Sequence, residues 1–134
     1  MLRYDFTVPI YDFDCTIVQL KEKENPKKIL KLLNEHNIGE DIKNEITTNM
    51  KNGYMDSALV LSNKNARLLL VILYPISSME RFVNIVAHEK RHMEDKITEA
   101  VELENGEGTA YLAGYLASAF YEFVKINKLW TILK

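Results

Sequence analysis

The sequence lacks several features that would assign it to a specialised class of protein. It has one cysteine, Cys15, in 134 residues. An internal disulfide is therefore excluded, and a reducing compartment is favoured. No internal sequence repeat, low-complexity tract or linker is found. These absences point to an ordinary globular domain.

The sequence also lacks long apolar segments. The longest unbroken apolar runs, residues 68–74 and 110–113, are far shorter than the roughly 20 residues that span a bilayer. The first residues, MLRYDFTVPIYDF, have no apolar core of the kind found in signal peptides. We therefore expect a cytoplasmic protein without a membrane partner.

The charge balance indicates which partners to exclude. The net charge is -2, and no basic patch is dense enough to indicate nucleic acid as a partner. A composition with 47% hydrophobic and 27% charged residues is typical of a globular protein. A length of 134 residues predicts a single domain, residues 1–134.

Residues 1–65 predict a hairpin followed by two helices. Apolar residues at 4, 6, 8 and 10 alternate with polar residues, which indicates a strand that pairs with a second strand over 13–20. Asn25-Pro26 is a typical helix start, and Gly39 is its expected end. A second short helix follows, with Ile42, Ile46 and Met50 expected to point inward. After it, a polar turn at residues 62–65 joins a strand over 58–61 to a strand over 67–74.

Residues 66–134 predict that last strand and two further helices. The strand over 67–74 is apolar at nearly every position, which favours burial on both faces, although an edge position beside a cleft would let it bind a peptide. Ser77 and Glu80 form a capping box that opens the third helix, and residues 107–126 form the fourth. The order predicts an α+β domain with one sheet of about four strands covered by helices.

The third helix contains the motif H-E-x-x-H, formed by His88, Glu89 and His92. The histidines are one helical turn apart, about 6 Å along the axis, so both imidazoles point the same way and can share one Zn²⁺. Glu89 is rotated by about 100° from His88, so it is free to act as a general base on a water. The alternative is a solvated, charged helix face. Lys90 and Arg91 favour that alternative, because a cation near a dication is unfavourable unless it is neutralised or distant.

A catalytic zinc normally has three protein ligands, so one more is expected. Glu107 is the first candidate, because it opens the last helix on the same face as Tyr111 and Tyr115. Its participation requires that the motif helix end near residues 97–100, so that the chain turns back toward His92. Asp95, three residues after His92, is the alternative as a ligand or as a partner of an imidazole N–H. His36 is expected to be a solvated residue at the end of the first helix.

Small residues form a ridge on the last helix, at positions 110, 113, 114 and 117. Such a ridge lets another helix approach closely. Two partners remain open: the motif helix across the metal, or a second subunit in a homo-oligomer.

The combination of His88-Glu89-x-x-His92 with Glu107-x-x-Ala110-Tyr111 resembles the gluzincin pattern. It is similar to the compact zincin-like metallopeptidase domains of bacteriophages and bacterial mobile elements, over roughly residues 66–124. The resemblance implies Zn²⁺ bound by His88, His92 and Glu107, with Glu89 as base and acid. It also implies that Tyr111 or Tyr115 stabilises the oxyanion. Lys90 and Arg91, which stand between Glu89 and His92, differ from the small apolar residues usual at these positions in the family.

The expected function is therefore a zinc metallopeptidase that acts on a peptide or protein substrate. Glu89 would take a proton from a zinc-activated water and pass it to the leaving amine. The alternative is a catalytically inactive, degenerate zincin-like module that binds a host or phage protein.

Overall fold

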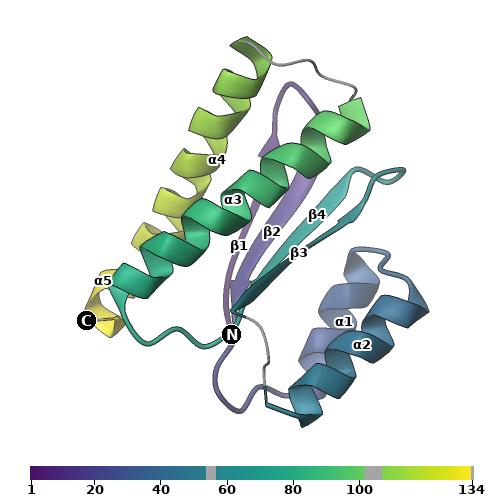
Figure 1. The fold of residues 1–134 in the computed structure, drawn as a ribbon, viewed down its shortest axis with the longest axis vertical. Helices are drawn as coiled ribbons and strands as arrows, with labels where there is room; N and C mark the ends of the chain where they lie inside the picture. The colour runs from purple at the N-terminus through teal and green to yellow at the C-terminus, as the bar shows by residue number, and fades with distance from the viewer. Residues whose placement is uncertain (54–56, 102–106, 134) are drawn as a thin grey trace.

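The computed structural model describes residues 1–53, 57–101 and 107–133, and it has an α+β fold. In the described residues the strands form one four-stranded mixed sheet in the order β1-β2-β4-β3, accompanied by five helices (Figure 1). The strands are β1 (Leu2–Val8), β2 (Phe13–Gln19), β3 (Ala58–Asn63) and β4 (Leu68–Leu73). The helices are α1 (Pro26–Glu35), α2 (Glu40–Lys51), α3 (Met79–Val101), α4 (Glu107–Ile126) and α5 (Leu129–Ile132).

The sheet consists of two antiparallel hairpins joined side by side. β1 pairs with β2, β3 pairs with β4, and β2 and β4 meet in parallel at the centre. Both predicted hairpins are confirmed. β4 lies in the interior of the sheet, so its apolar sequence reflects burial on both faces, and the alternative of an edge position is wrong. The edge strands are β1 and β3.

Two separate cores lie on the two faces of the sheet, since alternate residues of each central strand point to opposite sides. Residues such as Ile17 and Val71 face α3 and α4, and residues such as Val18 and Leu70 face α1 and α2. All four of these side chains are 0% exposed. Figure 1 shows the two helix pairs on opposite sides of the sheet.

The two halves of the chain repeat the same element order, a hairpin followed by two helices. Because β2 and β4 are parallel and their helix pairs cover opposite faces, a half-turn about an axis along the strands relates the halves. α1 then corresponds to α3, and β1 corresponds to β3. No matching repeat is visible in the amino-acid sequence.

The helix boundaries in the first half differ from those expected. The Asn25 side chain accepts a hydrogen bond from the Lys27 amide, which confirms the predicted cap. α1, however, ends at Glu35, because Asn37 adopts a left-handed φ of 52°. Gly39 is the residue that precedes α2 rather than the end of α1. Ile42 was expected to point inward but is 41% exposed, and Ile46 is the buried residue of α2.

The second half follows the prediction more closely. The hydroxyl that caps α3 belongs to Ser78, which accepts from the Arg81 amide, and not to Ser77 as expected. α4 has the predicted bounds, and α5 was not predicted. Within the described ranges, none of the helices is long and apolar enough to span a membrane.

The single thiol offers a simple test of this packing. Cys15 on β2 is 2% exposed, and its burial, with Asp14 nearby, raises the pKa of the thiol to about 12. The folded protein at pH 8 should therefore react with a thiol reagent at less than about a hundredth of the rate of free cysteine, since only the thiolate is nucleophilic. Titration with a chromogenic disulfide before and after denaturation measures this. Fast labelling of the native protein would contradict the assigned face of β2.

Candidate metal centre

The two histidines of the motif converge on the exposed flank of α3. The Nε2 atoms of His88 and His92 are 3.1 Å apart, and the ring centroids are 4.7 Å apart with the planes at 74°. The side chain of His88 is 67% exposed. The expectation that both imidazoles point the same way is therefore met by their placement.

The separation of the two nitrogens fits one metal ion. Two nitrogen ligands of a tetrahedral zinc, each about 2.05 Å from the ion, lie about 3.3 Å apart. The 3.1 Å observed also suits an N–H···N hydrogen bond, in which one neutral ring donates to the other. The 3.1 Å distance is therefore compatible both with a shared ion and with a hydrogen bond between the two rings.

Glu89 lies beside this pair but on the buried side of α3. One of its carboxylate oxygens is 4.0 Å from Nε2 of His88, and the residue is 7% exposed. The position follows from the helix geometry, because one residue of α-helix rotates the side chain by about 100°. A carboxylate at this distance can reach a water held between the two imidazoles.

The charged residues inside the motif are neutralised within α3. Lys90 Nζ donates to a Glu94 carboxylate oxygen at 2.6 Å. Arg91 lies 3.5 Å from the other Glu94 oxygen and 3.6 Å from Asp95. Neither cation is therefore left unpaired beside the histidines, which removes the electrostatic objection that the sequence raised.

Asp95 is not brought to the histidines. Its side chain is 51% exposed and pairs with Arg91. Over the residues that the structure describes, no three His, Cys, Asp or Glu side chains are grouped as they would be around a metal ion. The described side chains therefore bring together two candidate ligands and not a third.

Glu107 opens α4 as predicted, but its side chain lies outside the described residues. The motif helix α3 ends at Val101, one residue beyond the expected range of 97–100 and about 14 Å beyond His92 along the axis. The residues that lead from Val101 to Glu107 lie outside the described part of the chain, so the participation of Glu107 stays a prediction. In addition, the Tyr11 hydroxyl donates to the Gly108 carbonyl at 3.2 Å, so the first turn of α4 lies beside the β1–β2 turn.

Tyr111 and Tyr115 lie on the far side of the helical layer from the histidines. α4 packs on β1, and the Tyr115 hydroxyl donates to the Thr7 carbonyl of that strand at 2.9 Å. The Tyr111 ring stacks on Tyr115, with centroids 6.2 Å apart. α3 packs on β3, the opposite edge, about 14 Å from β1 across the sheet. The oxyanion role implied by the resemblance stays a prediction for both tyrosines.

A hollow adjoins the histidine pair along the edge of the sheet. It has a volume of about 320 Å³ and runs between α3 and the start of β3; its lining residues are Ser57, Ala58, Asn84, Ile85, His88 and Glu89. A second hollow of about 520 Å³ continues it toward the start of α3. The strand beside the candidate site is therefore β3, whose outer edge has no neighbouring strand among the residues that the structure describes.

The ridge of small residues on α4 is largely exposed, and Ala117 lines a hollow together with Phe82 and Val86 of α3. Ala110, Gly114 and Ala117 are exposed, and a Cβ added at Gly114 would meet no atom within 4 Å. Gly114 is therefore not required for the contact between α3 and α4. Of the two partners considered for the ridge, the motif helix is not the one that Gly114 contacts, and a second subunit stays a prediction.

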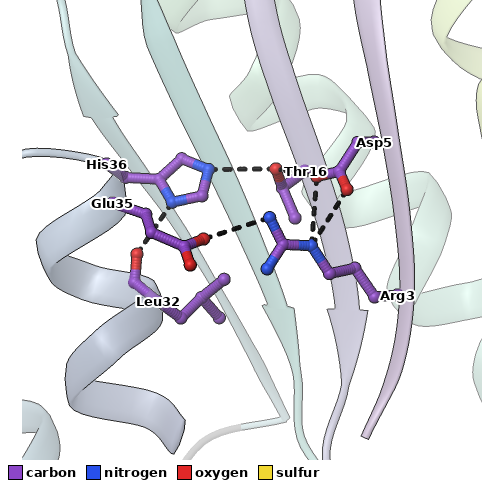
Figure 2. A network of polar contacts seen from close by, with 6 residues as sticks. All are labelled: Arg3, Asp5, Thr16, Leu32, Glu35 and His36. Carbon is purple, nitrogen blue, oxygen red and sulfur yellow. Dashed lines mark hydrogen bonds and ion pairs between the residues drawn. The ribbon is translucent and has the colours of Figure 1, made fainter.

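Sequence reasoning missed one polar residue, His36. It was expected to be solvated, but it is 5% exposed, and both of its ring nitrogens lie within hydrogen-bond distance of oxygens (Figure 2). The available signal was its position just after Leu32 and Leu33, on the face of α1 that packs against the sheet.

No family model, curated protein or solved structure matches the chain. The resemblance to zincin-like domains therefore depends on the motif residues and their geometry.

Removing the Tyr115 hydroxyl tests whether this group stabilises the fold or acts at the candidate site. Burial, together with Tyr4, Tyr111 and Cys15, raises the pKa of Tyr115, so the phenol is a donor at neutral pH. Tyr115→Phe should lower the free energy of unfolding by about 1 kcal/mol or less, the usual worth of one hydrogen bond. Urea denaturation measures the loss. The zinc affinity of the same variant should equal that of the wild type. A weaker zinc affinity would indicate that Tyr115 belongs to the candidate site.

Proposed function

We propose that this protein is a zinc-dependent metallopeptidase of zincin-like type. The observation that carries the proposal is the convergence of the His88 and His92 Nε2 atoms at 3.1 Å, with a carboxylate oxygen of Glu89 4.0 Å from His88. Two nitrogen donors and an adjacent carboxylate are the parts that hydrolysis by an activated water requires.

His88 and His92 would hold the metal through Nε2. When bound, zinc would polarise a water and the peptide carbonyl, which lowers the pKa of the water toward about 7. Glu89 would accept the proton of that water and deliver it to the leaving amine. Its carboxylate lies 4.0 Å from Nε2 of His88, within reach of a water held by the two imidazoles.

The third ligand decides whether the site is catalytic. Glu107 remains the predicted ligand, with the requirement that the first turn of α4 move from the β1–β2 turn toward His92. The proposed site otherwise has two protein ligands, and the remaining positions would be filled by water or substrate. Such a site would bind zinc more weakly than one with three protein ligands.

The substrate that suits the surroundings is an extended peptide. β3 is an edge strand, and its first residue, Ala58, lines the hollow that contains His88 and Glu89. A peptide that added to β3 as a further strand would pass beside the histidine pair, with backbone hydrogen bonds supplying the affinity.

Metal content is the direct test. Protein purified without added zinc and without a histidine-rich tag should contain or take up about one zinc per chain. His88→Ala and His92→Ala should each weaken zinc binding by more than about a hundredfold, beyond the 10–100-fold typical of supporting residues. Elemental analysis and calorimetric titration measure both quantities.

Three variants complete this titration. Glu99→Gln changes an exposed acid farther along α3 that pairs with Lys64, so zinc binding should stay at the wild-type level. Asp95→Asn and Glu107→Gln ask which acid contributes a third ligand. Wild-type zinc affinity in the two histidine variants would exclude the metal site.

Catalysis is tested through Glu89. Glu89→Gln retains the shape of the side chain but removes the proton acceptor, so kcat on casein or a peptide library should fall by about 10²–10⁴-fold. Zinc stoichiometry should be unchanged, and chelation should abolish the wild-type activity. Cleavage by the Gln variant at the wild-type rate would refute the role of Glu89.

A second candidate function is a degenerate zincin-like module that binds a host or phage protein without turnover. It is favoured by the absence of a third ligand among the described side chains and by the bond that holds the Tyr115 hydroxyl to the Thr7 carbonyl of β1. Stoichiometric zinc with no cleavage of any peptide would support this candidate. If the protein binds no zinc at all, the remaining interpretation is that the motif is a solvated, charged helix face.

A further inference from the structure

The outer edge of β1 presents backbone groups that point away from the sheet. In β2, the Asp14 amide donates to the Arg67 carbonyl, so the backbone groups of Asp14 point toward β4. Its partner on the other side, Thr7, is therefore turned away from β2, because the backbone direction alternates along an antiparallel pair. The same alternation turns Arg3 and Asp5 outward. Among the described residues, no strand lies beyond β1.

Tyr115 closes one end of this edge. Its hydroxyl donates to the outward Thr7 carbonyl at 2.9 Å, which agrees with the direction that the strand pairing gives for Thr7. A further strand on this edge can therefore pair with residues 2–6 but not with Thr7. The centre of the open part is Tyr4.

The outward residues in the open part have opposite charges. The side chains of Arg3 and Asp5 are 38% and 58% exposed, and Figure 2 shows them side by side on β1. Exposed charges on an edge strand discourage pairing with an unrelated strand. A strand with the complementary order of charges is accepted, and a second copy of β1 that runs antiparallel has that order.

The charges select one register for two antiparallel copies of β1. Outward residues of one copy must pair with outward residues of the other. With the two-fold axis at Arg3 or at Asp5, like charges would stand directly opposite each other, which is destabilising. With the axis at Tyr4, each Arg3 stands opposite the partner's Asp5. This is also the register centred on the part of the edge that Tyr115 leaves open.

The other side of β1 is self-complementary in the same register. Leu2, Tyr4 and Phe6 are partly buried and belong to the face that α4 covers. Leu2 would pair with the partner's Phe6, and the two Tyr4 side chains would meet at the axis. Within one copy the Tyr4 and Phe6 rings stack at 5.5 Å, and the Phe6 and Tyr115 rings lie 6.3 Å apart. Aromatic and apolar pairs across two strands stabilise a sheet.

The small residues of α4 suit this arrangement. α4 packs on β1 (Figure 1), so a two-fold axis perpendicular to the sheet places the two α4 helices on the same face, one on each side of the axis. Gly114 and Ser118 are exposed and lie within about 100° of Tyr115 around the helix. Small side chains let two helices approach closely. A Cβ at Gly114 would meet no atom within 4 Å, so one copy alone does not require a glycine there.

We propose that the protein forms a two-fold dimer in which the β1 strands pair antiparallel about Tyr4 and join the two four-stranded sheets into one. The interface is isologous, since each copy contributes the same strand and the same helix. It places β3 and the histidine pair at the two outer edges of the joined sheet. Dimer formation is therefore independent of zinc binding.

Charge exchange tests the register. Wild-type protein at micromolar concentration should sediment at equilibrium with twice the mass of one chain. Asp5→Arg puts two cations on the edge and Arg3→Asp puts two acids there, so each change alone should raise the dissociation constant by more than about a hundredfold. An equimolar mixture of these two variants should form a heterodimer, because every cation then faces an acid. The double variant Arg3→Asp/Asp5→Arg should dimerise again.

The matched control changes the charge at the opposite edge. Glu99→Arg replaces an exposed acid that pairs with Lys64 at the β3–β4 turn, so the dimer should be unaffected. A wild-type protein that is monomeric at millimolar concentration would overturn the proposal. Dimers that persist in both single-charge variants of β1 would overturn it as well.

Cross-linking locates the axis without any change of charge, so it decides the question if the charge variants do not fold. Tyr4→Cys places two thiols opposite each other at the axis, with Cβ atoms about 5 Å apart. Thr7→Cys places them six residues apart along the strands, about 20 Å. The native thiol, Cys15, is buried. Under mild oxidation, Tyr4→Cys should form a covalent dimer and Thr7→Cys should not. The reverse result, or no cross-link in either variant, would contradict an axis at Tyr4.

Hydrogen exchange distinguishes the two edges of the sheet. The Tyr74 amide donates to the Ser57 carbonyl, so Ala58 and Val60 are the outward residues of β3. In the dimer the amides of Arg3 and Asp5 should be protected, whereas those of Ala58 and Val60 should exchange quickly. Protection at β3 in place of β1 would put the interface at the opposite edge and overturn the proposal.

Discussion

The parallel pairing of β2 and β4 is the contact on which the rest of the structure depends. It joins two hairpins, which by themselves would each have one apolar strand without a partner on one side. Residues along both strands, such as Ile17 and Val71, are fully buried. A central pair that is apolar on both faces must be covered on both faces. The four long helices are arranged accordingly, with α1 and α2 on one face and α3 and α4 on the other.

The candidate metal centre is a consequence of how α3 meets the edge of this sheet. The buried stripe of α3 faces β3 and β4, so the residues at its flank stand at the rim, where the sheet ends. His88 and His92 occupy that rim, and the Glu89 carboxylate turns under them toward the core. The same packing separates the pair from α4, which lies over β1 at the other edge. The geometry therefore favours a two-histidine site with a carboxylate beneath it, open to the outer edge of β3.

Much of the fold could be predicted because it depends on local patterns. The hairpins, the cap at Asn25 and the bounds of α4 follow from alternation, turn residues and helix signals that act over a few positions. The order of the strands could not be predicted in this way, since the interior place of β4 depends on contacts between distant segments. The site shows the same division: the spacing of His88 and His92 is local to one helix, whereas the position of Glu107 depends on where α3 ends. Burial of His36 was missed because a histidine at a helix end has the same local pattern whether or not a sheet lies against it.

The repeated order of a hairpin followed by two helices makes the two halves of the chain topologically equivalent. A half-turn along the strand direction exchanges β2 with β4 and carries each helix pair to the opposite face, as it would in a dimer of a smaller ββαα unit paired through its inner strand. The chain thus has the architecture of two such protomers fused end to end. In that comparison α3 and α1 occupy equivalent places, although His88 and His92 of α3 are exposed and His36 at the end of α1 is buried.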